Sequence, residues 1–418
     1  MSTSIVIKLR SDECTSAATI QAAIDRLASA GGGVLQLPEL DLTLDRGLEL
    51  RSGVELRGCG ARTILRKAAS RVYPLNGYHN YGMRDVPLES AESLEAGMTV
   101  TVFDDKRQWF NATLARITWI DGAWVGLDCG LEADYAATEH PRLVTIFPMV
   151  FGRGIRGAAL RDVTLEGNLA ANPDVIDGCR NGAVYFIDSD DIEVTGVHQS
   201  DFNGEGISFQ LCSRLTIRDC SFSHNTGNGL HPGAGSTDIR FELCRSEGNS
   251  AFGLFFCVRA NHITTRGCTF ADNKEAGVSI GTRDCFNLIE DCDIMNNGGP
   301  GISVRPDPKP VEVHSCTVRR CRISQNTRTW GRAQIEIAGD AHDIVIERST
   351  LDGGGRTVGV LTTDRSASVF LDQNVMTNCL VETQGEGFVA QRPAFVCGAG
   401  FCEPRHYRHL AAGRPREI

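Results

Sequence analysis

A short sequence phrase returns at a fixed interval in the middle of this chain. Each copy opens with a cysteine and closes with an asparagine five residues later, as in Cys220-Ser-Phe-Ser-His-Asn225 and Cys268-Thr-Phe-Ala-Asp-Asn273. The cysteines at 220, 244, 268 and 292 lie 24 residues apart (244 minus 220), and a glycine follows each asparagine by four residues. A fixed period with a fixed internal pattern predicts one structural unit repeated along an axis. Equivalent positions of successive units then line one long face, where a functional surface is expected.

The phrase extends beyond these four copies. Val163-Thr-Leu-Glu-Gly-Asn168 carries it upstream, Val197 to Asn203 is one residue longer, and Cys321-Arg-Ile-Ser-Gln-Asn326 restores it after five inserted residues (321 minus 292 is 29). Each unit holds three short apolar-alternating pieces, which is typical of one turn of a parallel β-helix. The asparagine is expected in a tight turn, because Asn tolerates the left-handed conformation and its amide can bond to the next Asn of the stack.

The segments that flank the repeats have patterns of their own. Ile20, Ala23, Ile24 and Leu27 form one apolar stripe at helical spacing behind a suitable N-cap at Thr15 or Ser16. This helix, running to about residue 28, is predicted to cover the open apolar end of the stack. Residues 70–148 break the rhythm with longer alternating runs and three of the four tryptophans, and they predict a small antiparallel β insert.

Four segments follow from these patterns. The cap helix and first coils occupy residues 1–69, the insert 70–148, the main parallel β-helix 149–380, and a C-terminal cap or tail 381–418.

Composition narrows the class of protein. The net charge of -10, from 42 Lys+Arg against 52 Asp+Glu, counts against nucleic acid or an anionic membrane as partner. No run reaches the roughly 18 apolar residues of a spanning helix, and no signal peptide follows Met1, so a cytoplasmic protein is expected, with secreted or particle-associated forms left open. The 16 cysteines, several at equivalent repeat positions, are expected as buried reduced thiols.

Three features carry a resemblance to a known superfamily. They are Thr19-Ile-Gln-Ala-Ala-Ile-Asp25 followed by Gly31-Gly-Gly-Val-Leu-Gln-Leu-Pro38, then Leu50-Arg-Ser-Gly-Val-Glu-Leu-Arg-Gly-Cys-Gly60, and the asparagine-bearing repeats. With these the chain resembles the pectate-lyase-like superfamily. The resemblance implies an all-β fold: a right-handed single-stranded parallel β-helix (pectin-lyase-like) with an N-terminal capping helix and a small β insert. It also implies a saccharide chain as ligand, without choosing the reaction.

A local likeness to mannuronan epimerases lies within the repeats. Their signature Gly-x-Asp-Pro-His-Glu is similar to Gly229-Leu-His231-Pro-Gly-Ala234. The proline is kept, but His231 stands where the signature has Asp and Gly233 stands where it has His. The catalytic pair of that family is therefore not carried over.

Strand alternation predicts which residues of the third strand face outward. Ile207, Leu230, Leu254, Val278, Ile302 and Ile335 are expected inside. The next residues form an outward column: Tyr185, Ser208, His231, Phe255, Ser279, Ser303 and Glu336. A second outward column holds Gln210 and Arg305, and Arg259 and Arg283 follow at strand ends. Neighbours within a column are expected about 4.8 Å apart, close to the spacing of sugar units.

The outward residues predict a lyase-type site on an acidic saccharide. His231 is the candidate general base, with Tyr185, Arg259 and Arg283 as the other catalytic candidates. Arginine forks suit a uronate carboxylate, and aromatic rings suit sugar faces. The candidates for substrate binding are Ser208, Gln210, Phe255, Arg305, Asp201, Glu205 and Glu336.

Two other functions stay open at this point. A glycoside hydrolase would use paired carboxylates, for which Asp201 and Glu205 are the candidates. A saccharide-binding or adhesin-like module would use the same face without turnover. Zinc binding by Cys397, Cys402, His406 and His409 fits no standard spacing, so no metal and no cofactor are expected. The expected partner is a saccharide, with no nucleic acid and no membrane, and a homo-oligomer is left open.

Overall fold

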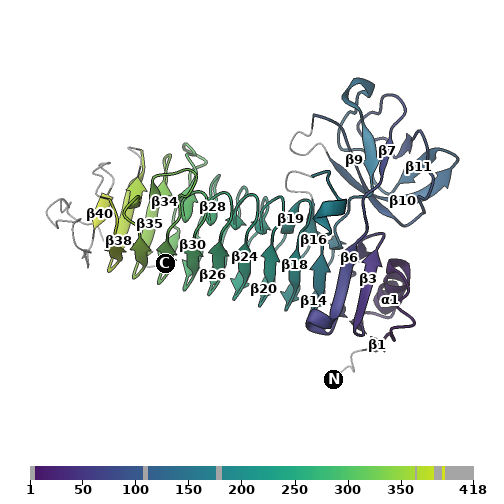
Figure 1. Cartoon of the computed structure of the whole chain (residues 1–418), viewed down its shortest axis with the longest axis horizontal. Coiled ribbons are helices and arrows are strands. Elements are labelled where there is room, and N and C mark those ends of the chain that lie inside the picture. Colours follow the sequence, from purple (N-terminus) through teal and green to yellow (C-terminus); the bar gives the residue numbers. More distant parts are fainter. Residues whose placement is uncertain (1–4, 107–111, 176–180, 363–364, 381–387, 391–418) are drawn as a thin grey trace. The chain divides into compact units, whose positions relative to one another are not determined.

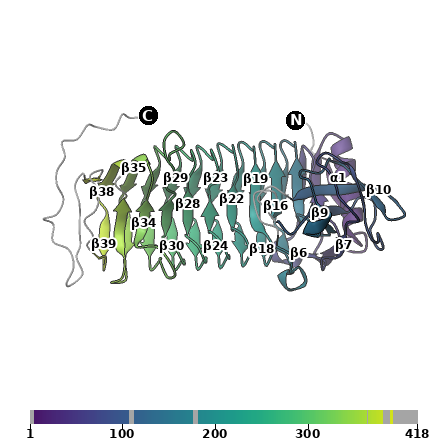
Figure 2. The ribbon, with the colours of Figure 1, turned by 90° about the horizontal axis from the view of Figure 1, so that it is seen from above.

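The computed structural model describes residues 5–106, 112–175, 181–362, 365–380 and 388–390. Two compact units divide the chain, Met1–His231 and Pro232–Ile418, and each is described by itself. Both units are built from short parallel strands that stack coil upon coil, as Figure 2 shows for the strands from β23 to β39 (unit 2). The predicted all-β parallel β-helix is confirmed.

Unit 1 holds three parallel sheets. The first consists of β1 (Val6–Lys8), β2 (Gly33–Gln36), β5 (Val54–Arg57), β14 (Ala159–Arg161), β17 (Glu193–Thr195) and β20 (Thr216–Arg218). The second consists of β3 (Leu40–Leu44), β6 (Thr63–Lys67), β15 (Thr164–Glu166), β18 (His198–Ser200) and β21 (Ser221–Ser223). The third consists of β4 (Leu48–Glu49), β13 (Val150–Arg153), β16 (Gly182–Ile187) and β19 (Glu205–Gln210), and β22 (Leu230–Pro232) falls at the unit boundary.

Unit 2 repeats the three-sheet pattern. Its first sheet holds β23 (Arg240–Glu242), β26 (Thr264–Arg266), β29 (Leu288–Glu290), β32 (Thr317–Arg319), β35 (His342–Glu347), β38 (Ala367–Asp372) and β40 (Phe388–Ala390). The second holds β24 (Arg245–Glu247), β27 (Thr269–Ala271), β30 (Asp293–Met295), β33 (Arg322–Ser324), β36 (Thr350–Asp352) and β39 (Val375–Thr377). The third holds β25 (Leu254–Phe255), β28 (Val278–Ile280), β31 (Ile302–Val304), β34 (Ala333–Ile337) and β37 (Val358–Thr362).

The predicted asparagine stack is present in unit 2. Asn249 Nδ2 donates to Asn273 Oδ1 (3.0 Å), Asn273 Nδ2 to Asn297 Oδ1 (3.0 Å), and Asn297 Nδ2 to Asn326 Oδ1 (2.8 Å). All four side chains are buried. The Nδ2 atoms of Asn273, Asn297 and Asn326 also donate to main-chain oxygens, those of Ser246, Phe270 and Ile294. The ladder therefore satisfies buried turn groups and fixes the register of successive coils.

The cysteine positions form a second buried row. Cys244, Cys268, Cys292 and Cys321 are each 1–2% exposed, and the Cys244 N–H lies 3.4 Å from Cys268 Sγ. They pack as small thiols beneath the turn, as predicted.

The N-terminal helix covers the first coil. α1 (Ala17–Ser29) begins at Ser16, whose side chain accepts from Thr19 N, and it buries the predicted stripe of Ile20, Ala23, Ile24 and Leu27. The helix packs on β2, β4 and β5. Three 3-10 turns complete the helical content described: η1 (Gly60–Arg62), η2 (Ala137–Glu139) and η3 (Leu169–Ala171). No helix in the described part of the chain is long and apolar enough to cross a membrane.

The predicted β insert is a six-stranded antiparallel sheet. Its strands run in the order β7 (Val72–Pro74), β12 (Arg142–Val144), β9 (Thr99–Phe103), β10 (Thr113–Asp121), β11 (Trp124–Leu127) and β8 (Asp85–Pro87). Figure 1 labels β7, β9, β10 and β11 of this sheet. Alternation along β9 and β10 buries Val100, Val102, Ala115 and Ile117 in the insert's own core. The boundaries predicted at residues 69, 148 and 380 stay predictions.

Charged side chains join the insert to the first coils of unit 1. Glu49 of β4 lies 3.2 Å from Arg116 of β10, and it also pairs with Arg51 (2.8 Å) and Arg153 (3.8 Å). Arg153 also forms an ion pair with Asp128 of the insert, at 2.7 Å. The network places insert residues beside the outward side of the third sheet.

Candidate functional site

The strand register aligns the residues predicted for the outward column of the third sheet within each unit. Tyr185 pairs with Ser208 in unit 1, and Phe255, Ser279, Ser303 and Glu336 pair in succession in unit 2. The six residues predicted inside are at most 1% exposed. In unit 1 the register extends the column backward from Tyr185 through Phe151 to Glu49.

Part of this outward face is packed rather than open. Tyr185 is 3% exposed, Ser208 0%, His231 2% and Ser279 1%, values that match those of the inner core. The expectation of an exposed trough is therefore wrong at these positions. Polar groups buried to this degree on a sheet face need defined partners.

A buried acid and a buried base meet at the end of unit 1. Glu205 Oε1 lies 3.4 Å from His231 Nδ1, and the two side chains are 6% and 2% exposed. Asn228 holds the carboxylate by two donors: its N–H reaches Glu205 Oε2 at 2.8 Å and its Nδ2 reaches Oε1 at 3.2 Å. A carboxylate at this distance stabilises an imidazolium, so the pair favours proton acceptance by the His231 ring.

Glycines shape the surroundings of this pair. A Cβ on Gly227 would lie 3.0 Å from the Glu205 Cδ and 3.0 Å from Gly204 O. A Cβ on Gly206 would lie 2.5 Å from Gly229 O. A side chain at Gly206 would clash with the main chain of the next coil, and one at Gly227 would crowd the Glu205 carboxylate, so the two glycines help to set where that carboxylate lies.

Asp201 and Glu205 lie in different environments. Asp201 is exposed, in a turn where its backbone is left-handed (φ 57°), whereas Glu205 is buried at the start of β19. The oxygens of Glu205 are directed to Asn228 and His231. The geometry supplies a carboxylate–imidazole pair rather than two carboxylates facing one bond.

Arg305 of unit 2 is held in place by four groups. Its guanidinium donates to Ser279 Oγ, Phe256 O and Cys257 O, each at 2.9 Å, and its Cζ lies 4.5 Å from the centre of the Phe255 ring. Its side chain is 24% exposed. Arg305, Ser279 and Phe255, all predicted on this face, are therefore brought together.

A carboxyl that the sequence analysis missed lies beneath Arg305. Asp284 is fully buried, 3.5 Å from Arg305 Nη2, and it accepts from Ala260 N (2.9 Å) and Gly281 N (2.8 Å). Burial raises the pKa of the Asp284 carboxyl to about 7 and lowers the pKa of the Arg305 guanidinium. A shifted pKa of this kind is common at functional and at structurally important sites. Strand alternation could not have pointed to Asp284, because the residue lies in a turn.

The other predicted residues are dispersed. Arg259 and Arg283 are exposed and left-handed (φ 58° and 60°), in the turns after β25 and β28. The Glu336 carboxylate accepts hydrogen bonds from the main-chain N–H groups of Arg332 and Ala333 (3.1 Å for Ala333). It therefore holds the loop that precedes its own strand. Gln210 is 7% exposed at the end of β19.

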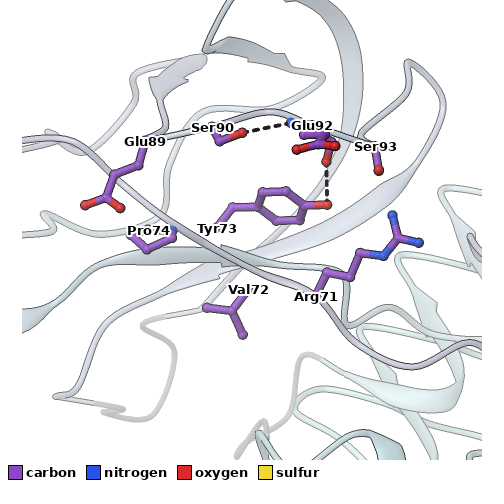
Figure 3. Close-up of a pocket in the computed structure, with 8 residues that line it drawn as sticks. All are labelled: Arg71, Val72, Tyr73, Pro74, Glu89, Ser90, Glu92 and Ser93. Carbon is purple, nitrogen blue, oxygen red and sulfur yellow. Dashed lines mark hydrogen bonds between the residues drawn. The ribbon is translucent and has the colours of Figure 1, made fainter.

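The insert carries a shallow open pocket of about 370 Å³. Figure 3 shows Tyr73 lying in it beside Pro74, with its hydroxyl donating to Glu92 O at 3.0 Å, and Arg71 and Glu89 at its sides. None of the predicted site residues lines this pocket.

The described residues hold no group of three or more His, Cys, Asp or Glu side chains placed for an ion. Cys397, Cys402, His406 and His409 lie outside the described residues.

Comparison with models of protein families assigns the chain to a family. The family described as right handed beta helix region matches residues 153–288 and 259–396, which together span more than half of the 418 residues. The chain therefore belongs to this right-handed β-helix family. No curated protein matches the sequence.

Solved structures show the same fold at low identity. The A-module of mannuronan C-5 epimerase AlgE6 from Azotobacter vinelandii has a TM-score of 0.62 at 16% identity, covering 94% of this chain and 98% of that one. The AlgE4 A-module of the same organism gives 0.58 at 17%, covering 93% and 98%. An exopolygalacturonase from Thermotoga maritima gives 0.54 at 12%, covering 95% and 92%. At these identities the likeness shows the fold.

Proposed function

We propose that this protein is a carbohydrate-active enzyme that acts on an acidic poly- or oligosaccharide by a lyase-type reaction. The observation that carries the proposal is the Glu205–His231 pair on the outward side of the third sheet. Three structural neighbours support the substrate class, because their names place them on mannuronan and polygalacturonate chains.

In the proposed reaction His231 removes the proton from the carbon next to a uronate carboxylate. Glu205 stabilises the imidazolium that forms, and Asn228 keeps the carboxylate in position. The electron pair left on the carbon forms a carbon–carbon double bond as the glycosidic carbon–oxygen bond breaks. The leaving oxygen takes a proton from an acid, for which Tyr185 on β16 is the candidate.

A partner for the substrate carboxylate is also needed. An arginine that neutralises the carboxylate makes the neighbouring proton more acidic, and Arg forks match carboxylate geometry. The arginines predicted for this role from the sequence, Arg259, Arg283 and Arg305, stay predictions.

The hydrolase alternative has less support. It needs two carboxyl groups about 5–9.5 Å apart across one bond. Asp201 is exposed in a turn while Glu205 is paired with His231, so the residues present favour proton abstraction over hydrolysis.

A product screen tests the proposal. Wild-type protein is incubated with acidic glycans (alginate, polygalacturonate) and neutral ones (cellulose and starch oligomers), and both ultraviolet absorbance and reducing ends are measured. The proposal expects absorbance from a new double bond on an acidic glycan, lowered about 100-fold or more in His231→Ala. Reducing ends without absorbance would favour the hydrolase, and binding without either product would favour the non-catalytic module.

A further inference from the structure

The turn before one outward strand of unit 2 departs from the repeat. From the ladder asparagine to the first inward residue, the chain takes five residues in one coil (Asn297 to Ile302) and nine in the next (Asn326 to Ile335). The four extra residues build a loop that carries Trp330, the only tryptophan outside the insert segment. Inserted loops beside a repeat face are where binding residues concentrate.

Main-chain bonds fasten this loop to the preceding coil. Thr329 N and Trp330 N both donate to Gly298 O, at 2.7 Å and 3.0 Å, and Thr327 N donates to Gly299 O at 2.7 Å. From the other side, the Glu336 carboxylate accepts from Arg332 N and Ala333 N. The loop is thus held at both ends, and the tryptophan has little freedom to move.

The preceding coil has the residues needed to receive the indole. A Cβ on Gly299 would lie 2.4 Å from Cε2 and Cζ2 of Trp330, and a Cβ on Gly298 would lie 1.9 Å from Lys274 O. At the equivalent positions Ser250-Ala251 follows Asn249, Lys274-Glu275 follows Asn273 and Thr226-Gly227 follows Asn225, so the glycine pair is found only after Asn297 among these four coils. The glycine pair of one coil therefore leaves room for the extended loop of the next coil. Together these two departures from the repeat hold the indole ring of Trp330.

The seated ring remains open to solvent. Trp330 is 38% exposed although one side of the indole rests on Gly299. Arg328 and Arg332 flank it in sequence, and both are exposed. A fixed and partly exposed aromatic ring offers stacking to the C–H face of a pyranose. The two arginines of the same loop offer positive charge for its carboxylate, although Arg328 also pairs with Asp272 at 3.2 Å.

We propose that Trp330 is a saccharide-stacking residue that holds one sugar ring of an acidic chain at the edge of the third sheet of unit 2. The inference rests on the proposed function for its ligand class. Gly299 positions the ring, and Glu336 positions the loop.

Direct binding tests the inference apart from turnover. Oligogalacturonate and oligomannuronate are titrated into the full-length protein by calorimetry, with cello-oligosaccharides as the neutral comparison. Trp330→Ala is expected to weaken binding of the acidic oligomers about tenfold, and Trp330→Phe by less, because a smaller ring stays in place. Gly299→Ala is expected to weaken binding although the tryptophan is retained, since the new Cβ displaces the ring.

Trp119→Ala is the matched control. Trp119 lies on β10 of the insert with 44% exposure, so its removal takes away an equally exposed indole elsewhere. Circular dichroism checks that every variant is folded. Wild-type affinity in both Trp330→Ala and Gly299→Ala would overturn the inference, and it would leave the proposed function standing if His231→Ala still abolished turnover. A wild-type protein that neither binds nor converts the acidic oligomers would overturn both.

Discussion

At the residue scale, the proposed reaction depends on where the Glu205 carboxylate of unit 1 lies. Gly227→Ala puts a Cβ 3.0 Å from the Glu205 Cδ, so the carboxylate is displaced from His231. We expect kcat on the acidic glycan to fall about tenfold or more with KM little changed, because the pair acts in the reaction rather than in binding.

A readout that a purely structural defect would not give is the pH profile. Without Glu205 close to Nδ1, the imidazolium loses a stabilising charge, and the acidic limb of the kcat/KM profile, which reports the general base, moves to lower pH. A variant with an unaltered profile and unaltered kcat would show that Glu205 does not act through His231.

Asp284 predicts a pH dependence of stability at the same scale. Burial raises the pKa of the Asp284 carboxyl in the folded protein to about 7, from an ordinary value of 3.8, so the fold favours the protonated acid. Stability from this group is fully present below about pH 4 and is lost as the pH rises to about 7, by at most about 1.4 kcal/mol per pH unit.

Denaturant unfolding of wild-type protein and Asp284→Asn across this pH range measures the effect. The amide carries no charge, so the difference in unfolding free energy between the two proteins is expected to change with pH in favour of the variant as the pH rises. Parallel pH curves for the two proteins would contradict this assignment.

At the element scale, the asparagine ladder fixes the coils of unit 2. In Asn273→Ala, the Asn249 N–H and Nδ2 lose their acceptor, while Asn297 Oδ1 and Ser246 O lose a donor. All of these groups are buried, so the unfolding free energy is expected to fall by about 2–4 kcal/mol.

The neighbouring residue supplies the control for this ladder prediction. Lys274→Ala changes an exposed side chain one position further along and is expected to stay within about 0.5 kcal/mol of wild type. Equal losses in the two variants would mean that the ladder does not stabilise the coils specifically.

The join between the insert and the first coils is a second element-scale feature. Glu49, 10% exposed, faces Arg51, Arg116 and Arg153, so Glu49→Ala leaves three cations without their shared partner. We expect a loss of about 1–3 kcal/mol and faster proteolytic cleavage in the insert, with Glu89→Ala, on the pocket rim of the insert, as the exposed control. Unchanged proteolysis would show that this network does not hold the insert in place.

At the scale of the whole molecule, the repeat predicted the fold because every unit has the same pattern of strands and turns. The period located the strands, the ladder and the inward residues, and the structure confirms all three. The first coils were harder to read, because the insert interrupts the period, and so Glu49 and Phe151 were not added to the outward column although their register places them there.

The site was predictable only in part. His231, Ser279, Phe255 and Arg305 follow from strand alternation. Asn228, Asp284 and the Trp330 loop lie in turns, where alternation gives no direction, and their roles come from contacts between coils. Burial of the outward residues was missed, since period alone does not say what packs over a sheet face.

The proposed function depends on His231, with Glu205 beside it, removing a proton next to a sugar carboxylate. Nuclear magnetic resonance of a uronate oligomer in deuterated water measures this step directly, by loss of the proton signal at that carbon. We expect rapid loss with wild-type protein and almost none with folded His231→Ala. Loss at the wild-type rate in that variant would contradict it.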